Sequence, residues 1–161
     1  MRIAVISDTH LVSPGLAFSA LVEKHLLGAD AIWHCGDIVS ADTYHYLAGA
    51  HPNVTAVLGN CDDPRLAGEL PPTRTLELEG FSVGLAHGWG PRSRVPLAVL
   101  EAFGPGVDIV CFGHTHNPLW ERVGRTWLLN PGSLRLDGPE PSFAWLTMEP
   151  GKEPKAEHVR I

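Results

Sequence analysis

The chain has 161 residues, 44% of them apolar, and its 12 basic and 18 acidic residues give a net charge of −6. Its length favours a single domain over residues 1–161, while the acidic balance and dispersed basic residues argue against binding to nucleic acid. No apolar run reaches the ~20 residues that span a bilayer, so we expect no membrane segment. No signal segment precedes the first apolar run, and three cysteines do not form a disulfide framework, so we expect a cytoplasmic protein.

The first half of the chain alternates strand-like and helix-like segments. Apolar runs predict strands at Arg2–Ser7, Ala31–His34 and Val54–Leu58. Between them, apolar residues at helical spacing predict helices at Leu16–Leu27 and Ala41–Gly49. This alternation is typical of βαβ units and predicts a largely parallel arrangement.

The character of the sequence changes after Pro71-Pro72. Two alternating runs, Thr73–Glu79 and Phe81–Ala86, flank a turn at Gly80 and predict a hairpin that begins a second sheet. The remaining predicted elements are a helix at Val95–Phe103 and strands at Val107–Phe112, Leu119–Val123, Thr126–Leu129, Ser142–Met148 and, at an edge, Glu157–Ile161.

Five short motifs follow predicted strands, at the carboxyl ends where open sheets present their ligand-binding crevice. They are Asp8-Thr9-His10, Gly36-Asp37, Gly59-Asn60-Cys61-Asp62, His87-Gly88 and Gly113-His114-Thr115-His116. Two carboxylates, one amide oxygen and four imidazoles form a mixed donor set that suits first-row divalent metals. The candidate ligands are Asp8, His10, Asp37, Asn60, His87, His114 and His116. Seven donors are enough for two ions.

A pair of adjacent metal ions would explain why carboxylates and imidazoles occur together in these motifs. A carboxylate can bridge two cations, and Asp37 is our candidate for that bridge. Cations roughly 3.5–4 Å apart can deprotonate a shared water and grip a phosphoryl group. We therefore expect a hydroxide held between the two ions to attack the phosphorus of a phosphate ester.

Each single residue also has a structural interpretation. A strand-end aspartate such as Asp8 is often only a turn or helix-capping residue. Cys61 can be an inert thiol, and Arg92 can belong to a solvated face. The number and order of the motifs favour the functional interpretation of the seven candidate ligands. Asn60, Cys61 and Arg92 are the candidate substrate contacts, and for Arg92 the solvated face is the favoured alternative.

The order of these motifs, DxH, GD, GN, a histidine before glycine and GHTH, resembles the calcineurin-like metallophosphoesterases. The chain is similar to the small YfcE-type phosphodiesterases of that family over nearly its whole length, including Asn130-Pro131-Gly132-Ser133. The resemblance implies an α/β fold, a four-layer α/β/β/α sandwich of two mixed β-sheets flanked by helices. It also implies a Mn pair, with Fe, Ni, Co or Zn as alternatives. By the same resemblance, the bridging hydroxide attacks the phosphorus of a small phosphodiester, and Asp37, Asn60 and His87 are the catalytic residues.

The resemblance divides the ligands between the two ions. It assigns Asp8, His10 and His116 to the first ion, Asn60, His87 and His114 to the second, and Asp37 to both. Two positions depart from the family pattern, because Cys61 stands where a proton-donating histidine is usual and Trp89 where another histidine is expected. A thiol is a weak general acid, so we expect better turnover of activated aryl diesters than of esters with poor leaving groups.

Two alternatives remain beside the phosphodiesterase. A scaffold subunit of the eukaryotic retromer coat shares this fold and length without being an enzyme, but in such relatives the histidine of the first motif is lost, whereas His10 is present here. The other alternative is a phosphomonoesterase or nuclease of the same superfamily. Exposed edge strands and five tryptophans are compatible with a homo-oligomer.

Overall fold

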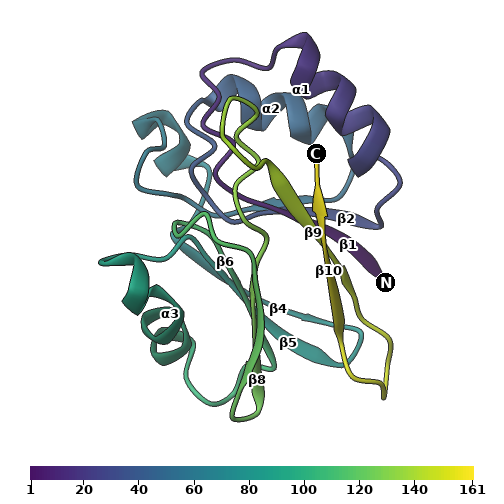
Figure 1. Cartoon of the computed structure of the whole chain (residues 1–161), viewed down its shortest axis with the longest axis vertical. Coiled ribbons are helices and arrows are strands. Elements are labelled where there is room, and N and C mark those ends of the chain that lie inside the picture. Colours follow the sequence, from purple (N-terminus) through teal and green to yellow (C-terminus); the bar gives the residue numbers. More distant parts are fainter.

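The computed structural model describes residues 1–161 and contains two five-stranded sheets (Figure 1). The first sheet has the strand order β10-β9-β1-β2-β3. Its strands are β1 (Arg2–Ile6), β2 (Ala31–His34), β3 (Val54–Ala56), β9 (Ser142–Thr147) and β10 (Lys155–Arg160). The neighbours β1, β2 and β3 run parallel, as the sequence predicts, whereas β9 is antiparallel to β1 and to the edge strand β10.

The second sheet begins with the predicted hairpin and has the order β4-β5-β6-β8-β7. Its strands are β4 (Thr73–Leu78), β5 (Phe81–Ala86), β6 (Ile109–Phe112), β7 (Leu119–Val123) and β8 (Thr126–Asn130). Here β5, β6 and β8 are parallel, and the outer strands β4 and β7 are antiparallel to their neighbours. Both sheets are therefore mixed.

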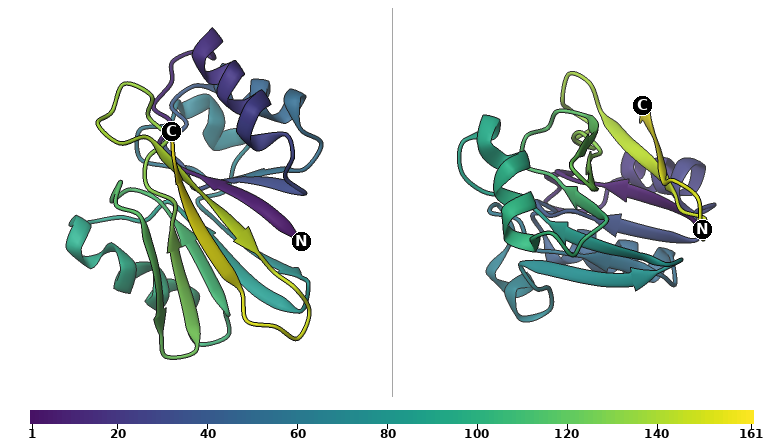
Figure 2. Two further views of the ribbon diagram at one scale, coloured as in Figure 1. Left: turned by 45° about the vertical axis from the view of Figure 1, so that its right-hand side comes forward. Right: turned by 90° about the horizontal axis from the view of Figure 1, so that it is seen from below.

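Helices cover the outer faces of the two sheets (Figure 2). They are α1 (Leu16–Leu21), continued by the π-helical η1 (Val22–Leu26), α2 (Ala41–Ala50) and α3 (Val95–Phe103), with short 3-10 turns η2 (Pro64–Gly68) and η3 (Arg92–Arg94). Phe18 of α1 and Leu47 of α2 pack on the first sheet, and Val99 of α3 packs on the second. The predicted four-layer sandwich is confirmed. None of the helices has the length and apolar character that crossing a membrane needs.

An apolar core joins the sheets. Val5 and Trp33 of the first sheet belong to one buried cluster with Leu85, Cys111 and Leu129 of the second. Alternate residues of each strand point to this cluster, because side chains in a strand alternate between faces. This packing fixes the position of one sheet against the other.

One predicted helix differs in kind from the structure. The segment Leu16–Leu27 begins as an α-helix but widens at Val22, where the Leu27 N–H donates to the Val22 carbonyl at 3.1 Å, five residues earlier. The wider turn keeps both Val22 and Leu26 in the core. The other predicted elements are present, with ends that differ by two residues or fewer.

Candidate metal centre

The five motifs lie in loops at one edge of the sandwich. Parallel strands bring the loops that follow them to the same edge of each sheet, and hydrogen bonds then join the two sets of loops. His87 Nδ1 donates to the Cys35 carbonyl at 2.8 Å, and the His114 N–H donates to Asp8 Oδ2 at 3.1 Å. Candidate ligands from both sheets therefore meet.

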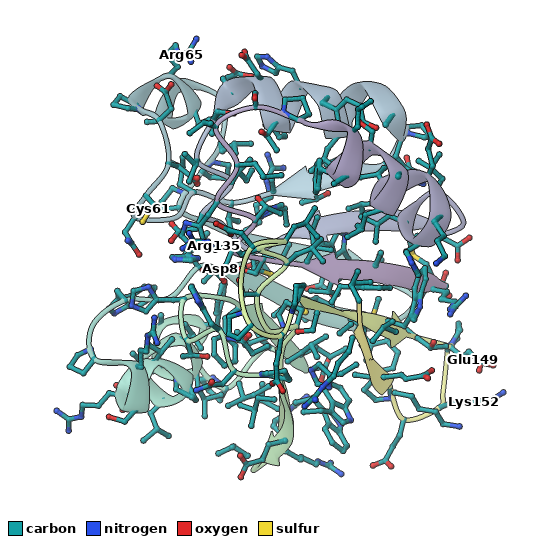
Figure 3. All side chains as sticks on the ribbon, turned by 45° about the horizontal axis from the view of Figure 1, so that its top comes forward. Asp8, Cys61, Arg65, Arg135, Glu149 and Lys152 are labelled. Carbon is teal, nitrogen blue, oxygen red and sulfur yellow. The ribbon has the colours of Figure 1, made fainter.

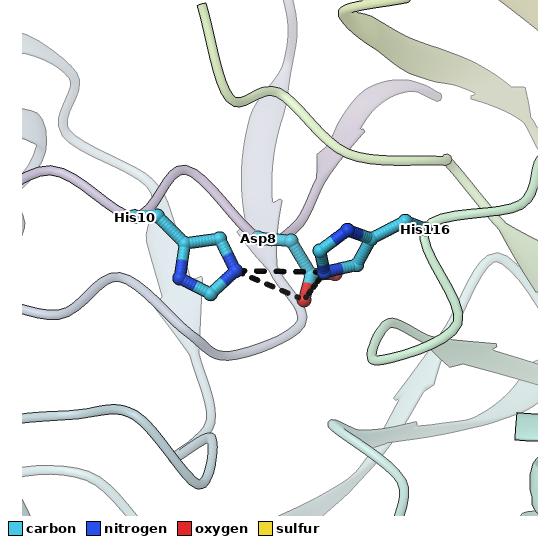
Figure 4. Close-up of side chains that lie close together, drawn as sticks. All are labelled: Asp8, His10 and His116. Carbon is cyan, nitrogen blue, oxygen red and sulfur yellow. Dashed lines mark hydrogen bonds and ion pairs between the residues drawn. The ribbon is translucent and has the colours of Figure 1, made fainter. Parts of the chain in front are cut away.

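Asp8 lies at the centre of the first cluster of side chains. Its Oδ1 is 3.1 Å from His116 Nε2 and 3.8 Å from His10 Nε2, and the two imidazole nitrogens are 3.5 Å apart (Figure 4). All three donor atoms lie within 4.8 Å of one another. Asp8 is fully buried, whereas the two histidines are half-buried at its open side.

Asp37 extends this cluster toward His87. Asp37 Oδ2 is 3.3 Å from His87 Nε2 and 3.7 Å from His10 Nε2, while His87 Nε2 is 3.9 Å from Asp8 Oδ1. The other oxygen of Asp37, Oδ1, accepts the Cys61 N–H at 2.8 Å. Asp37 thus lies between His10 of the first cluster and His87, which is where a bridging carboxylate would stand.

Asn60 and His114 form a separate pair beside His87. His114 Nδ1 and Asn60 Oδ1 are 2.9 Å apart, and His114 Nε2 lies 3.2 Å from the Gly90 carbonyl. A neutral imidazole that donates from Nε2 to that carbonyl leaves a lone pair on Nδ1, facing the amide oxygen. The rings of His114 and His87 meet edge to face at 5.1 Å. In that tautomer a cation could bind both Nδ1 and the amide oxygen, whereas in the other tautomer Nδ1 donates to Asn60 Oδ1.

The buried polar atoms of the site also fit a cation. Asp8 Oδ1 and His87 Nε2 are buried and have no hydrogen-bond partner. They lie 3.9 Å from each other, and His116 Nε2 lies 3.1 Å from Asp8 Oδ1. Leaving such atoms unsatisfied costs about 1–3 kcal/mol each. Because His87 Nδ1 donates to the Cys35 carbonyl, its Nε2 can present a lone pair to a metal. These residues therefore suit a divalent cation.

Hydrogen bonds hold the two aspartates in place. Ser7 Oγ donates to Asp8 Oδ2 at 2.6 Å, so that Oδ1 remains free to face the histidines. Asp62 accepts the Val39 N–H at 2.6 Å and the Gly59 N–H at 2.7 Å, which ties the loop after β3 to the loop that carries Asp37. Sequence reasoning missed Ser7, and its position directly before Asp8 was the only available signal.

The turn at Asn130 supports the loop of His114 and His116. Asn130 Nδ2 donates to the Gly113 carbonyl at 2.8 Å and to Thr115 Oγ1 at 3.1 Å. Three residues later, Ser133 Oγ donates to the Asp8 carbonyl at 2.9 Å. One turn therefore contacts two of the ligand-bearing loops.

The backbone of the candidate ligands is unusual. Seven residues other than glycine have a positive φ in this chain, and five of these are candidate ligands: Asp8, His10, Asp37, His114 and His116, with φ between 50° and 65°. The left-handed conformation costs an L-residue roughly 1–2 kcal/mol. Strain of this kind concentrates at functional sites, where the surrounding structure enforces it.

Gly59 is required where the loop after β3 passes Asp37. A Cβ atom added to Gly59 would clash with the backbone nitrogen and with Oδ1 of Asp37. The nitrogen is a backbone atom, and Oδ1 belongs to a buried carboxylate that the Cys61 N–H holds in place, so the neighbours cannot easily move away. Gly59 thus lets Asn60 and Cys61 approach Asp37.

We predict that Gly59→Ala weakens metal binding and lowers metal-dependent turnover by about 10-fold or more, because a shift of Asp37 disturbs a preorganised site. Isothermal titration with Mn²⁺ and a hydrolysis assay would measure both effects. Gly49→Ala is the matched control, since its added Cβ meets nothing within 4 Å and it lies inside α2. Equal metal affinity in the two variants would contradict the prediction.

Three pKa values describe the electrostatics of the site. Burial opposes ionisation of Asp37, but the His87 imidazole 3.3 Å away and the hydrogen bond from the Cys61 N–H outweigh it and hold the pKa of this carboxyl well below its usual range. Burial lowers the pKa of His34 to about 3, so this core histidine, whose Nε2 is 3.2 Å from Thr9 Oγ1, is neutral. Burial and the nearby Asp37 raise the pKa of Cys61 to about 11, so this residue is a thiol at neutral pH.

A polar cleft of about 540 Å³ opens beside His116. The residues that line it are Arg92, His116, Asn117, Pro118, Ser133, Arg135, Asp137, Gly138, Pro139 and Glu140. Arg92, predicted to contact substrate, therefore faces a space next to the candidate ligands. Trp89 is 47% exposed but does not line this cleft.

Comparisons with known proteins agree with this geometry. The model of a family described as the calcineurin-like phosphoesterase superfamily domain matches residues 1–151. A probable metallophosphoesterase of Methanothermobacter thermautotrophicus is 35% identical over 156 residues, which cover 86% of this chain and 87% of that protein. A phosphodiesterase of Methanocaldococcus jannaschii is 25% identical and covers 82% of this chain and 83% of its own length.

A solved structure has the same architecture. Wild-type Vps29 of Entamoeba histolytica, complexed with zinc, superposes with a TM-score of 0.72 and is 25% identical to this chain, with 99% of both chains covered.

Proposed function

The chain belongs to the calcineurin-like phosphoesterase superfamily, and from this premise we propose that it is a phosphodiesterase that depends on two divalent metal ions. Membership of this family supports a metal-dependent hydrolase. The carrying observation is that Asp8 Oδ1 and His87 Nε2 are buried without hydrogen-bond partners among converging carboxylates and imidazoles. We further propose that residues 1–161 act as one catalytic domain in the cytoplasm, with manganese as the native metal.

The ligand assignment follows the two groups of side chains. We propose that one ion is held by Asp8, His10 and His116, that the other is held by Asn60, His87 and His114, and that Asp37 contacts both. Two such cations would lower the pKa of a shared water and neutralise charge on the phosphoryl group. Asp37 Oδ2 faces His10 and His87 while its Oδ1 is fixed by the Cys61 N–H, so the carboxylate is already oriented.

The substrate side of the site is formed by exposed residues. We propose that Asn60, Cys61 and Arg92 contact the substrate. The amide of Asn60 donates to Cys61 Sγ at 3.2 Å, so both side chains lie together at the surface. With a pKa of about 11, Cys61 is a poor proton donor to a leaving group, which favours substrates whose leaving group departs without a proton.

We predict that metal-stripped protein hydrolyses bis(p-nitrophenyl) phosphate only after Mn²⁺ is added, and that it turns over p-nitrophenyl phosphate at least about 10-fold more slowly. Release of p-nitrophenol measures both rates. Higher activity on the monoester would favour the phosphomonoesterase alternative instead.

Metal binding alone does not establish turnover. The Vps29 structure with zinc has the same fold, so a scaffold that binds metal is the second candidate. Two bound ions per chain without hydrolysis of either ester, with any of Mn²⁺, Fe²⁺, Ni²⁺, Co²⁺ or Zn²⁺, would favour that candidate.

A further inference from the structure

The polar cleft beside His116 is the part of the molecule that the two-metal chemistry does not explain. It adjoins the candidate ligands, because His116 lines it and Ser133, which also lines it, donates to the Asp8 carbonyl at 2.9 Å. In the view of Figure 3, Arg135 and Asp8 are both drawn near the middle of the molecule. A substrate whose phosphodiester lies on the ions would therefore extend one arm into this cleft.

The lining of the cleft limits what that arm is. Two prolines are its only apolar side chains, and the only ring that could stack on a base is the imidazole of His116, a candidate ligand. Binding sites for aromatic or aliphatic groups are lined mainly by apolar and aromatic side chains. The cleft therefore suits a hydrophilic arm rather than a stacked aromatic group.

The charges of the cleft leave one free cation. Arg135 is paired with Asp137, with Nε 2.6 Å from Oδ1 and Nη2 3.1 Å from Oδ2, and Glu140 is 3.1 Å from Arg160 Nη1. Arg92 makes no ion pair or side-chain hydrogen bond, although it faces the same space. The Arg135 guanidinium, held in place by Asp137, still has unused N–H groups.

We propose that this cleft binds a second phosphate group of the substrate, with Arg92 as the residue that recognises it and Arg135 as an oriented second donor. The inference rests on the proposed function and narrows it to phosphodiesters that carry a further phosphate on one hydrophilic arm. Arginine suits this role, because its planar guanidinium forms charge-assisted, bidentate hydrogen bonds to phosphate.

The test compares two ligands that differ by one phosphate. Calorimetry measures the binding of thymidine 5′-phosphate and thymidine 3′,5′-bisphosphate to the Mn²⁺-loaded protein. We expect the bisphosphate to bind about 10-fold more tightly, as one charge-assisted contact allows. In Arg92→Gln this preference should fall to about 2-fold or less.

The matched control is Arg94→Gln. Arg94 belongs to the same short helical turn as Arg92 and is exposed, but it does not line the cleft, so the preference should persist in this variant. Since both variants meet the same ligands, chelation of Mn²⁺ by the bisphosphate affects them equally.

Three results would overturn the inference: equal binding of both ligands by the wild-type protein, no binding of either, or an equal loss of preference in Arg92→Gln and Arg94→Gln. Hydrolysis of bis(p-nitrophenyl) phosphate is measured separately and tests the proposed function. Turnover without a preference for the bisphosphate rejects the cleft proposal alone, whereas a preference without turnover rejects the phosphodiesterase and leaves an anion-binding cleft.

Discussion

Replacing Asp37 by asparagine should abolish metal-dependent hydrolysis, with a loss of about 100-fold or more in kcat/KM for bis(p-nitrophenyl) phosphate. Asparagine keeps the shape of the side chain, and its amide oxygen can still accept the Cys61 N–H that Asp37 Oδ1 accepts at 2.8 Å. What it removes is the negative charge between His10 and His87. A neutral amide cannot damp the repulsion between two cations, so at least one of them should be lost.

The measurement combines turnover with the number of bound ions. Elemental analysis of Mn²⁺-loaded protein should find two ions per wild-type chain and fewer in Asp37→Asn. Asp63→Asn provides the control. Asp63 lies in the loop after β3, and its backbone N–H donates to the Val39 carbonyl near Asp37, but its Oδ2 pairs with Arg65 Nη2 at 2.7 Å and it is no candidate ligand. If Asp37→Asn kept both ions and its turnover, Asp37 would not be the bridge.

Removing the metal should also destabilise the fold. Ligand that binds only the native state at 100 times its Kd adds about 2.7 kcal/mol, so two ions would add about 5 kcal/mol. For a chain of this length each kcal/mol moves Tm by about 2–4 °C, which gives a rise of about 10–20 °C. The expected rise is large because the metal-free site contains strained backbone and unpartnered buried atoms.

Differential scanning calorimetry of EDTA-treated protein, with Mn²⁺ added back, measures this shift. The Tm shift should be smaller in Asp37→Asn than in the wild-type protein. This comparison distinguishes Mn²⁺ binding at the site from a non-specific effect of the added salt on stability. A Tm that stays constant up to millimolar Mn²⁺ in the wild-type protein would mean that the converging side chains do not hold metal.

Much of the fold follows from the order of apolar runs. Strands such as β2 and the hairpin of β4 and β5 appear in the sequence as continuous or alternating apolar segments between breakers. Periodicity could not predict the π-helical turn at Val22, because widening a helix by one residue depends on which side chains the sheet below accepts. Periodicity also could not predict that β3 ends at Ala56, two residues before the predicted end at Leu58.

The candidate site was predictable as a set of residue types but not as an arrangement. Motifs at strand ends indicate that Asp8, Asp37 and His87 lie at one edge of their sheets. They do not indicate that Asp8 Oδ1 remains unpartnered, because this depends on Ser7 occupying the other oxygen. The cleft residue Arg135 was also missed, since its loop reaches the site only after β9 joins β1.

The apolar layer between the sheets has a consequence for the choice of metal. Asp8 and Asp37 follow strands of one sheet, while His87 and His114 follow strands of the other, and Val5 and Leu85 are among the side chains that separate the two. The thickness of that layer therefore sets the span across which oxygen and nitrogen donors face each other. Adding or removing one methylene group in that layer, well away from the site, would change the distance between the facing donor atoms. It would therefore change which ionic radius the site fits best, and with it the preferred cation.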